Sequence, residues 1–177
     1  EYELLFQINE DGNSYSVCGI QFGDPVEIQV EIPSSYNGLP VTKINNDAFG
    51  YCENITAVVI PNSVKSIGDC AFYYCTGLTS VVIPDSVNNI GKQAFRLCTS
   101  LNSITIPDGV TLGLDVFLDT GYYNNRSNWI NGVLYIGNHI IETDGTSSGS
   151  LVIKEGTLSI PDSAFVGCGN ITSVTIP

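Results

Sequence analysis

A segment of 23 residues recurs along this chain and limits what it can fold into. Two regular copies are IPNSVKSIGDCAFYYCTGLTSVV, starting at Ile60, and IPDSVNNIGKQAFRLCTSLNSIT, starting at Ile83. An irregular copy begins at Ile32 and a diverged one at Ile153. The phenylalanines at 49, 72 and 95 keep the same step. A repeat of this length indicates a solenoid, because a single unit cannot bury its apolar face alone.

Each repeat contains two kinds of periodicity. Val81 and Ile83 alternate with Ser80 and Val82, which predicts a strand with one buried face. Ala71, Cys75 and Leu78 fall at i, i+4 and i+7, a spacing that predicts one or two helical turns packed on the sheet. We therefore expect a strand-rich α/β repeat solenoid, folded as a single domain with one continuous core.

Residues 1–31 do not follow the repeat and are predicted to form an N-terminal cap, with the array running over residues 32–177. The Asp11-Gly12 pair suits the turn of a β-hairpin, since glycine accepts positive φ. The hairpin strands are expected around Phe6 and Ile8 and around Tyr15 and Val17. A further strand should lead into the first rung through the alternating residues Val26, Ile28, Val30 and Ile32.

One insertion, at about residues 118–149, interrupts the array. Residues 133–136 and 139–141 flank Gly137-Asn138 and predict a tight hairpin, with the Ser/Gly stretch 145–150 as its return. The preceding rung at 106–117 is irregular: Leu112-Gly113 comes one residue early, and Thr120 stands where other repeats have cysteine. The chain contains no methionine and breaks off inside another rung, so we expect a fragment of a longer protein.

Four of the six cysteines mark a repeat position, because each lies three residues after a repeat phenylalanine: Cys52, Cys75, Cys98 and Cys168. Equivalent residues on adjacent rungs lie about 4.8 Å apart and point the same way. A disulfide requires closer, converging Cβ atoms. We therefore expect buried free thiols at these four positions, whereas the pairing of Cys18 and Cys70 stays open.

The composition argues against several classes of function. With 18 acidic and 6 basic side chains, the net charge is −12, which disfavours binding to nucleic acid and to anionic lipid. No run of about 20 apolar residues is present, so no membrane insertion is expected. The one histidine, His139, lies in the predicted hairpin, and no pattern brings nucleophile, base and acid together. We expect no catalytic residues, no metal and no cofactor.

The pattern I-P-x-S-V-x-x-I-G-x-x-A-F-x-x-C-x-x-L-x-x-V resembles the BspA-like leucine-rich repeats of bacterial surface proteins over roughly residues 32–177. The Ala-Phe-x-x-Cys element at a 23-residue step is what makes the resemblance specific. It implies a leucine-rich repeat protein that is secreted or carried on the cell surface and that, in some members, adheres to host or matrix proteins. It implies no catalytic residues.

Two surfaces are candidates for recognition. One is the outward face of the repeat strands, represented by Ser80, Val82, Ser103 and Thr105. The other consists of tyrosines beside the turns and in the insertion, namely Tyr51, Tyr73, Tyr74, Tyr122 and Tyr123. Both have a simpler interpretation, as a solvated sheet face and as packing of the insertion through Trp129 and Tyr135. We expect binding of a protein or glycan, with host-derived ligands included; the alternative is a structural spacer or accessory module of a larger surface protein or enzyme.

Overall fold

The computed structural model describes residues 1–23, 27–161 and 164–177 and is a strand-rich β-solenoid. Its residues form two compact units, Glu1–Tyr122 and Tyr123–Pro177, which are described separately below. Within the described residues, helix is limited to α1 (Gly121–Asn124) and the short 3-10 helix η1 (Arg126–Asn128). The expected repeat solenoid is confirmed, with strand far exceeding helix.

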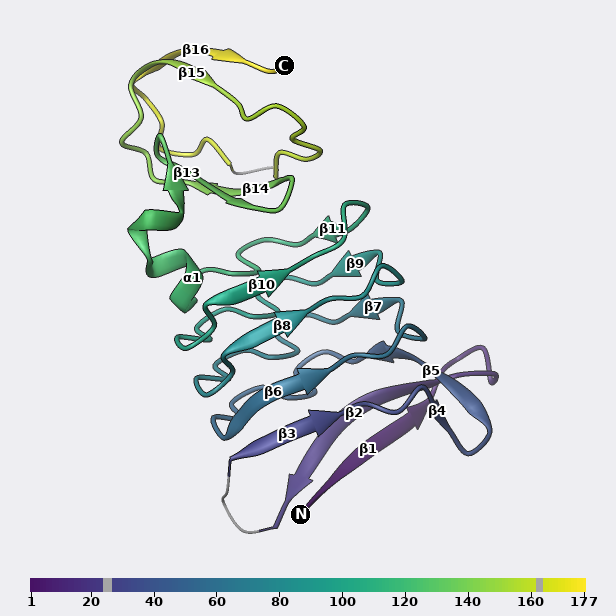
Figure 1. The fold of residues 1–177 in the computed structure, drawn as a ribbon. Coiled ribbons are helices and arrows are strands. Elements are labelled where there is room, and N and C mark those ends of the chain that lie inside the picture. Colours follow the sequence, from purple (N-terminus) through teal and green to yellow (C-terminus); the bar gives the residue numbers. More distant parts are fainter. Residues whose placement is uncertain (24–26, 162–163) are drawn as a thin grey trace. The chain divides into compact units, whose positions relative to one another are not determined.

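Two sheets run along the first unit (Figure 1). The four-stranded sheet has the order β10-β8-β6-β3, and its strands are β3 (Ile28–Glu31), β6 (Ile55–Val59), β8 (Ser80–Val82) and β10 (Ser103–Thr105). The second sheet has the order β1-β2-β5-β7-β9-β11. Its repeat strands are β5 (Leu39–Ile44), β7 (Ser66–Ile67), β9 (Asn89–Ile90) and β11 (Thr111–Leu112), with β4 (Ser35–Tyr36) paired to β5. Pairs between successive rungs are parallel, as stacked turns require.

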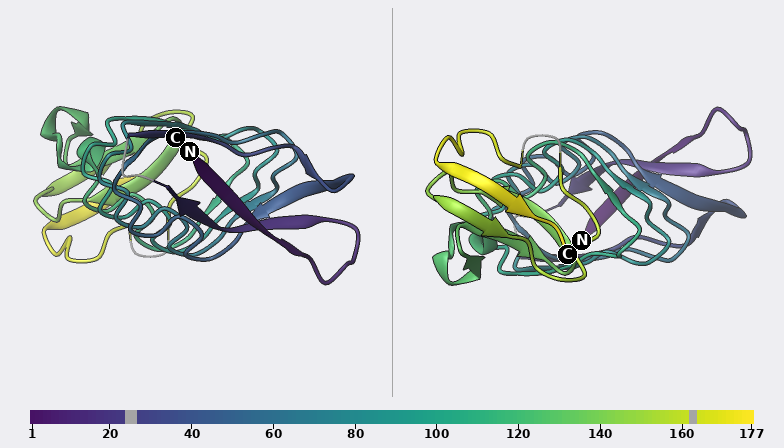
Figure 2. Two further views of the ribbon diagram at one scale, coloured as in Figure 1. Left: turned by 90° about the horizontal axis from the view of Figure 1, so that it is seen from below. Right: turned by 90° about the horizontal axis from the view of Figure 1, so that it is seen from above.

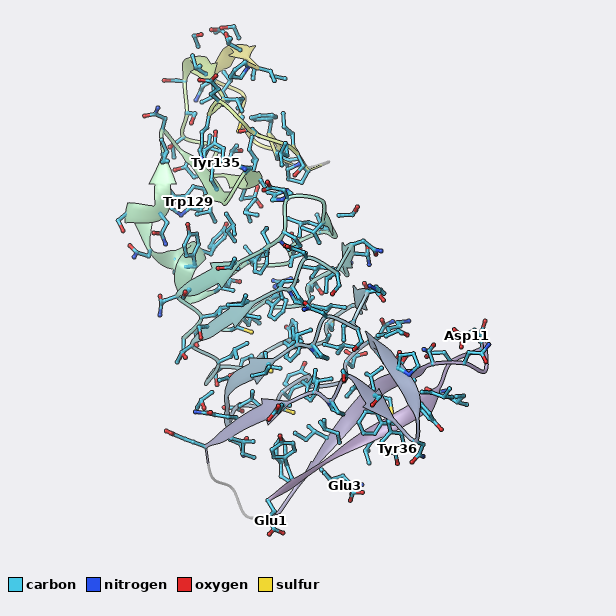
Figure 3. All side chains as sticks on the ribbon, turned by 45° about the vertical axis from the view of Figure 1, so that its right-hand side comes forward. Glu1, Glu3, Asp11, Tyr36, Trp129 and Tyr135 are labelled. Carbon is cyan, nitrogen blue, oxygen red and sulfur yellow. The ribbon has the colours of Figure 1, made fainter. Side chains whose placement is uncertain are left out.

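The predicted N-terminal hairpin is present. Strands β1 (Tyr2–Ile8) and β2 (Tyr15–Phe22) pair antiparallel, and Gly12 takes φ +65° in the connecting turn. Its tip, around Asp11, extends beyond the stacked turns (Figures 2 and 3). Strand β2 then pairs in parallel with β5, which joins the hairpin to the array. The parallel sheet begins at Ile28, within the segment expected to be cap; Val26 of the same predicted strand lies outside the described residues.

The helical turns predicted around Ala71, Cys75 and Leu78 are wrong, because this segment forms tight turns without a helix. Cys70 and Tyr74 have φ of +53° and +59°, and left-handed residues four positions apart prevent a right-handed helix. The Phe72 amide also donates to Ala94 O of the next rung at 2.7 Å, so it is not available to a helix. Hydrogen bonding between rungs therefore replaces bonding within a helix.

Phenylalanine rings and glycines set the spacing of the rungs. Phe49, Phe72, Phe95 and Phe117 are fully buried and stack with centroid distances of 4.9, 5.0 and 5.6 Å. At Gly91 a Cβ atom would lie 2.5 Å from the backbone nitrogen of Asp69 on the preceding rung, so only glycine allows this close approach. The irregular rung keeps its register, since Leu112 still pairs with Ile90.

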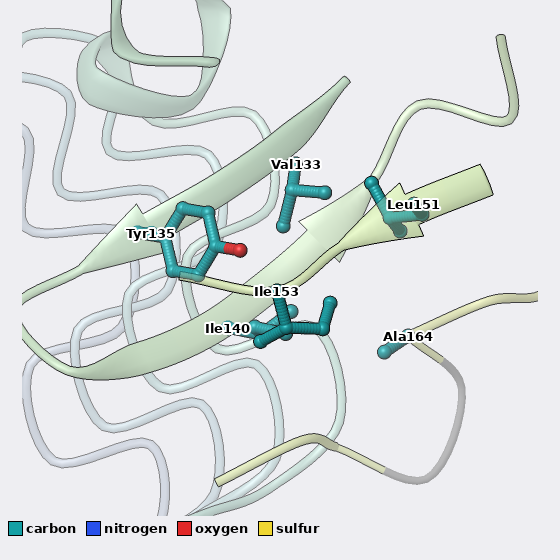
Figure 4. Packing of buried hydrophobic residues seen from close by; sticks show 6 residues of the cluster. All are labelled: Val133, Tyr135, Ile140, Leu151, Ile153 and Ala164. Atoms are coloured by element: carbon teal, nitrogen blue, oxygen red, sulfur yellow. The ribbon is translucent and has the colours of Figure 1, made fainter. Parts of the chain in front are cut away.

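The second unit contains the insertion and the last rungs. The predicted tight hairpin is present as β13 (Val133–Ile136) and β14 (His139–Thr143), and β12 (Trp129–Ile130) extends it to three strands. Strands β15 (Gly149–Val152) and β16 (Ile171–Thr175) pair in parallel and resume the array. A core of Val133, Tyr135, Ile140, Leu151, Ile153 and Ala164 joins the hairpin to these rungs (Figure 4).

Candidate functional site: a tyrosine cluster and an outward sheet face

The outward residues of the four-stranded sheet are brought into rows by parallel pairing. Ser80 lies opposite Ser103, and Val82 lies opposite Thr105. All four side chains are exposed, and Val82 is 66% accessible. The predicted sheet surface is therefore contiguous. It is small and mostly hydroxylated, without the Trp, Tyr or Arg side chains that usually anchor a protein interface.

Three of the predicted tyrosines form one cluster in the first unit. The ring centroid of Tyr51 lies 5.4 Å from that of Tyr73 and 5.7 Å from that of Tyr74. The backbone explains the contact, because the Tyr51 amide donates to Tyr73 O at 2.7 Å across neighbouring rungs. Tyr51 is 69% exposed and Tyr74 36% exposed, whereas Tyr73 is half-buried. We refer to these three residues as the tyrosine cluster.

The backbone at two of these tyrosines is unusual. Tyr51 and Tyr74 have φ of +61° and +59°, in the left-handed region that tyrosine rarely occupies. Leu97 is the equivalent residue one rung further on, also at positive φ, and Gly167 holds the position in the last rung at φ +80°. A glycine is therefore compatible with this turn, and the two rings are not needed to form it. Aligning Phe-Val-Gly-Cys with Phe-Tyr-Tyr-Cys is the sequence signal that could have identified this feature.

The tyrosine hydroxyls of the cluster have no hydrogen-bond partner in the described part of the protein. Glu53, two residues after Tyr51, is exposed. Glu27 is also exposed and immediately precedes Ile28. The Ile28 amide donates a 2.9 Å hydrogen bond to Asn54 O, and Asn54 is the residue after Glu53. The cluster is thus an exposed aromatic surface with free hydroxyls and two carboxylates on the adjoining backbone.

The two remaining tyrosine candidates lie elsewhere. Tyr122, in α1, is half-buried, and burial raises the pKa of its hydroxyl. Tyr123 packs edge-on against Trp129 with centroids 5.3 Å apart, and its carbonyl accepts a 2.8 Å bond from Trp129 Nε1. Tyr135 is buried, and its hydroxyl accepts a bond from the Lys154 amide. In the insertion these aromatic residues contribute to packing within their own unit.

Two of the repeat cysteines donate hydrogen bonds to the backbone of the preceding rung. Cys52, Cys75 and Cys98 are buried as predicted, whereas Cys168 is only half-buried; all six cysteines are free thiols. The Cys75 thiol donates to Phe49 O at 3.0 Å, and the Cys98 thiol to Phe72 O at 3.1 Å. Burial raises the pKa of Cys52 to about 11, and contact with Cys98 together with burial raises the pKa of Cys75. These thiols are structural groups.

Groups with catalytic or metal-binding chemistry are sparse. His139 is buried, and its Nδ1 lies 2.7 Å from Ser159 Oγ in the second unit. Across residues 1–23, 27–161 and 164–177, no three His, Cys, Asp or Glu side chains gather closely enough to hold a metal ion. Over the same ranges, no helix has the length and hydropathy required to cross a bilayer.

Comparison with known proteins identifies the repeat. The family model described as the BspA type leucine-rich repeat region matches six copies, over residues 29–143 and 135–177. The chain belongs to the BspA-type leucine-rich repeat family. Members of this family are typically surface-associated and generally not enzymes, and the family association suggests a binding or adhesion module. No curated protein matches the chain significantly.

Solved structures of other leucine-rich repeat proteins are similar to this one. A leucine-rich repeat protein from Bacteroides ovatus is 27% identical, with a TM-score of 0.63, and the match covers 99% of this chain and 40% of that protein. A leucine rich cell surface protein from Faecalibacterium prausnitzii is 28% identical, with a TM-score of 0.58, over 98% of this chain and 41% of that protein. A leucine-rich repeat protein from Bacteroides capillosus is 31% identical, with a TM-score of 0.61, over 69% of this chain and 91% of that protein. The chain thus spans less than half the length of the first two.

Proposed function

We propose that this chain is a non-catalytic, extracellular or cell-surface module that binds another protein through the tyrosine cluster. The carrying observation is that Tyr51 and Tyr74 occupy left-handed positions where glycine is accommodated in the last rung. A left-handed conformation costs an ordinary residue about 1–2 kcal/mol. Leu97 and Asp119 take the same conformation on other rungs, so the turn itself requires no ring. Two large, exposed rings with free hydroxyls on successive rungs are therefore better explained by recognition than by folding.

Tyrosine suits this role chemically. Its ring provides a large, rigid contact area, and its hydroxyl supplies a hydrogen bond at the outer end. Tyrosine is also enriched among the residues that contribute most binding energy at protein interfaces. The outward sheet face at Ser80, Val82, Ser103 and Thr105 is the second candidate surface, and its small side chains favour the less demanding role of a spacer.

The test compares binding and stability in the double variant Tyr51→Asn/Tyr74→Asn. Asparagine tolerates positive φ, so relief of backbone strain offsets the lost ring contacts. We expect the melting temperature to change by no more than a few degrees, since about 1 kcal/mol shifts a protein of this size by roughly 2–4 °C. Binding to immobilised matrix proteins, measured by surface plasmon resonance, should weaken at least tenfold.

Two controls separate recognition from packing. Leu97→Asn makes the same substitution at the equivalent backbone position, outside the cluster, and should leave binding unchanged. Tyr36→Asn removes a different exposed tyrosine, stacked on Phe6 in the N-terminal hairpin region, and should also leave binding unchanged. Full binding by a stably folded double variant would refute the proposal and favour the spacer role. Failure of the wild type to bind any member of a panel of matrix proteins and mucin glycans would do the same.

A further inference from the structure

Acidic charge is concentrated in the unit that carries the tyrosine cluster. Residues 1–122 hold 14 acidic and 4 basic side chains, a net charge of −10, whereas residues 123–177 hold 4 acidic and 2 basic side chains, a net charge of −2. A binding surface in the first unit therefore lies in a negative field, which raises the local concentration of cations and speeds their association.

The immediate surroundings of the cluster have the same sign. Glu53 is exposed two residues after Tyr51, and exposed Glu27 adjoins it through the bond from Ile28 N to Asn54 O. Arg96 follows Tyr73 by one repeat, and its Nη1 lies 3.8 Å from Asp115 Oδ2, so this nearby cation already faces a carboxylate. The cluster thus combines exposed aromatic rings with an excess of negative charge, because the nearby carboxylates of Glu53, Glu27, Asp47 and Asp69 outnumber the cations of Lys92 and Arg96.

Aromatic faces attract cations through their negative quadrupole, and flanking carboxylates strengthen that attraction. Tyr51 and Tyr74 are tilted by 38° to each other, and Tyr51 and Tyr73 by 62°. Such rings do not make the single flat platform on which a sugar ring would stack. Their differently oriented faces suit several separate cationic side chains along a polypeptide. Their free hydroxyls can also accept hydrogen bonds from ammonium or guanidinium groups.

We propose, resting on the function proposed above, that the partner segment recognised by the tyrosine cluster is a basic polypeptide stretch rich in lysine or arginine. The rings of Tyr51 and Tyr74 receive the cationic heads, and Glu53 and Glu27 supply the charge that orients them. The specificity is for exposed positive side chains on an extended segment and not for a carbohydrate.

The probe for the test is a fluorescein-labelled decalysine peptide, with binding followed by fluorescence anisotropy at low and at near-physiological salt. We expect the wild type to bind it and to lose affinity as salt rises, because the attraction is electrostatic. The variant Tyr51→Asn/Tyr74→Asn should bind roughly tenfold more weakly at both salt concentrations, since cation–π contacts are lost. Leu97→Asn should bind like the wild type.

A charge-matched pair shows whether the effect is local. Glu53→Gln and Glu3→Gln each remove one negative charge from the same unit, but Glu3 lies on β1 of the N-terminal hairpin (Figure 3). Glu53→Gln should weaken decalysine binding severalfold, whereas Glu3→Gln should have little effect. Equal effects of the two variants, together with unchanged binding by the tyrosine variant, would mean that decalysine senses only the overall charge and would overturn the inference.

The experiments can disprove the basic partner segment without disproving the proposed protein-binding function. A matrix protein that requires Tyr51 and Tyr74, but that binds independently of salt and is not displaced by unlabelled decalysine, would overturn the basic partner and leave the protein-binding role intact. Tyrosine-dependent binding of a neutral mucin glycan in place of decalysine would also overturn it. Displacement of a bound matrix protein by decalysine, with the same dependence on Tyr51 and Tyr74, is the expected result.

Discussion

Four phenylalanine rings stack through the first unit, and each fills the space between its neighbours. Phe72 has a ring on both sides, with centroids at 4.9 Å for Phe49 and 5.0 Å for Phe95 and planes within 10° of parallel. Its side chain is fully buried. A ring in this position contributes both apolar burial and aromatic contacts to two rungs at once.

Replacing Phe72 by alanine should lower the free energy of unfolding by about 3–5 kcal/mol, because the deletion leaves a cavity between two rings that cannot close without moving a rung. Urea denaturation followed by circular dichroism measures the change. Val82→Ala, at a side chain that is 66% exposed, is the matched surface control and should change stability by less than about 0.5 kcal/mol. A loss below about 1 kcal/mol for Phe72→Ala would contradict its place in the core.

The buried thiols predict a dependence of stability on alkaline pH. Cys52 has a pKa of about 11 in the folded protein, against an ordinary value of 9.0. The unfolded chain therefore ionises first, so the stabilisation is complete below pH 9 and is lost as pH rises through 11. Melting temperatures should fall between pH 8 and 10.5, and less steeply in Cys52→Ala. The same slope in both proteins would exclude Cys52 as a contributor.

At the scale of the element, the turn glycines decide how closely two rungs approach. At Gly91 an added Cβ atom would meet the backbone nitrogen of Asp69 at 2.5 Å, and at Gly68 it would meet that of Asn46 at the same distance. At Gly109 no heavy atom lies within 4 Å of that position. The Ile-Gly pair of the repeat is therefore a packing requirement, and the glycine at 109 is not part of it.

Gly91→Ala should destabilise the protein by about 1–3 kcal/mol, because backbone atoms cannot move away without separating the rungs. Gly109→Ala should stay within about 0.5 kcal/mol of the wild type, or gain slightly from the reduced entropy of the unfolded chain. Thermal melts of the two variants provide the comparison. Equal stability of Gly91→Ala and Gly109→Ala would refute the proposed close contact.

Individual elements differ in how far they could be predicted. The strand at Val81 was evident from alternation, and the hairpin at Gly137 from its turn residues, because both signals are local. The helix prediction for the turn at residues 70–74 is wrong. The i, i+4 spacing of its apolar residues is compatible with a helix, but it is equally compatible with a turn whose amides donate to the next rung. The sequence places Tyr51, Tyr73 and Tyr74 only beside the repeat turns; their contact with one another, and the left-handed backbone at Tyr51 and Tyr74, depend on contacts between rungs.

At the scale of the whole molecule, the described chain forms two compact units that divide between Tyr122 and Tyr123. The first has the phenylalanine stack, and the second has its own core around Tyr135, Ile140 and Leu151. In a repeat array, each rung is stabilised chiefly by its immediate neighbours. Each unit thus has its own set of stabilising contacts.

A chain comprising residues 1–122 alone should therefore fold cooperatively and keep a strand-rich circular dichroism spectrum. Its net charge of −10 should make its melting temperature rise with salt, because screening reduces repulsion among the 14 acidic side chains. Circular dichroism melts at two salt concentrations test both points. A spectrum without strand signal, or a non-cooperative melt, would show that the first unit depends on residues 123–177.

Each repeat contains positions that pack against the neighbouring rung and positions that face solvent, and this difference affects how such a protein can evolve. Phenylalanine, cysteine and glycine columns leave little freedom, because each contacts the rung beside it. The outward positions, such as Ser80, face solvent, and the left-handed corner accepts tyrosine at 74, leucine at 97 and glycine at 167. Mutation and duplication can therefore rewrite a surface one rung at a time while the scaffold keeps its fold. Selection for new binding surfaces would act on those few variable columns.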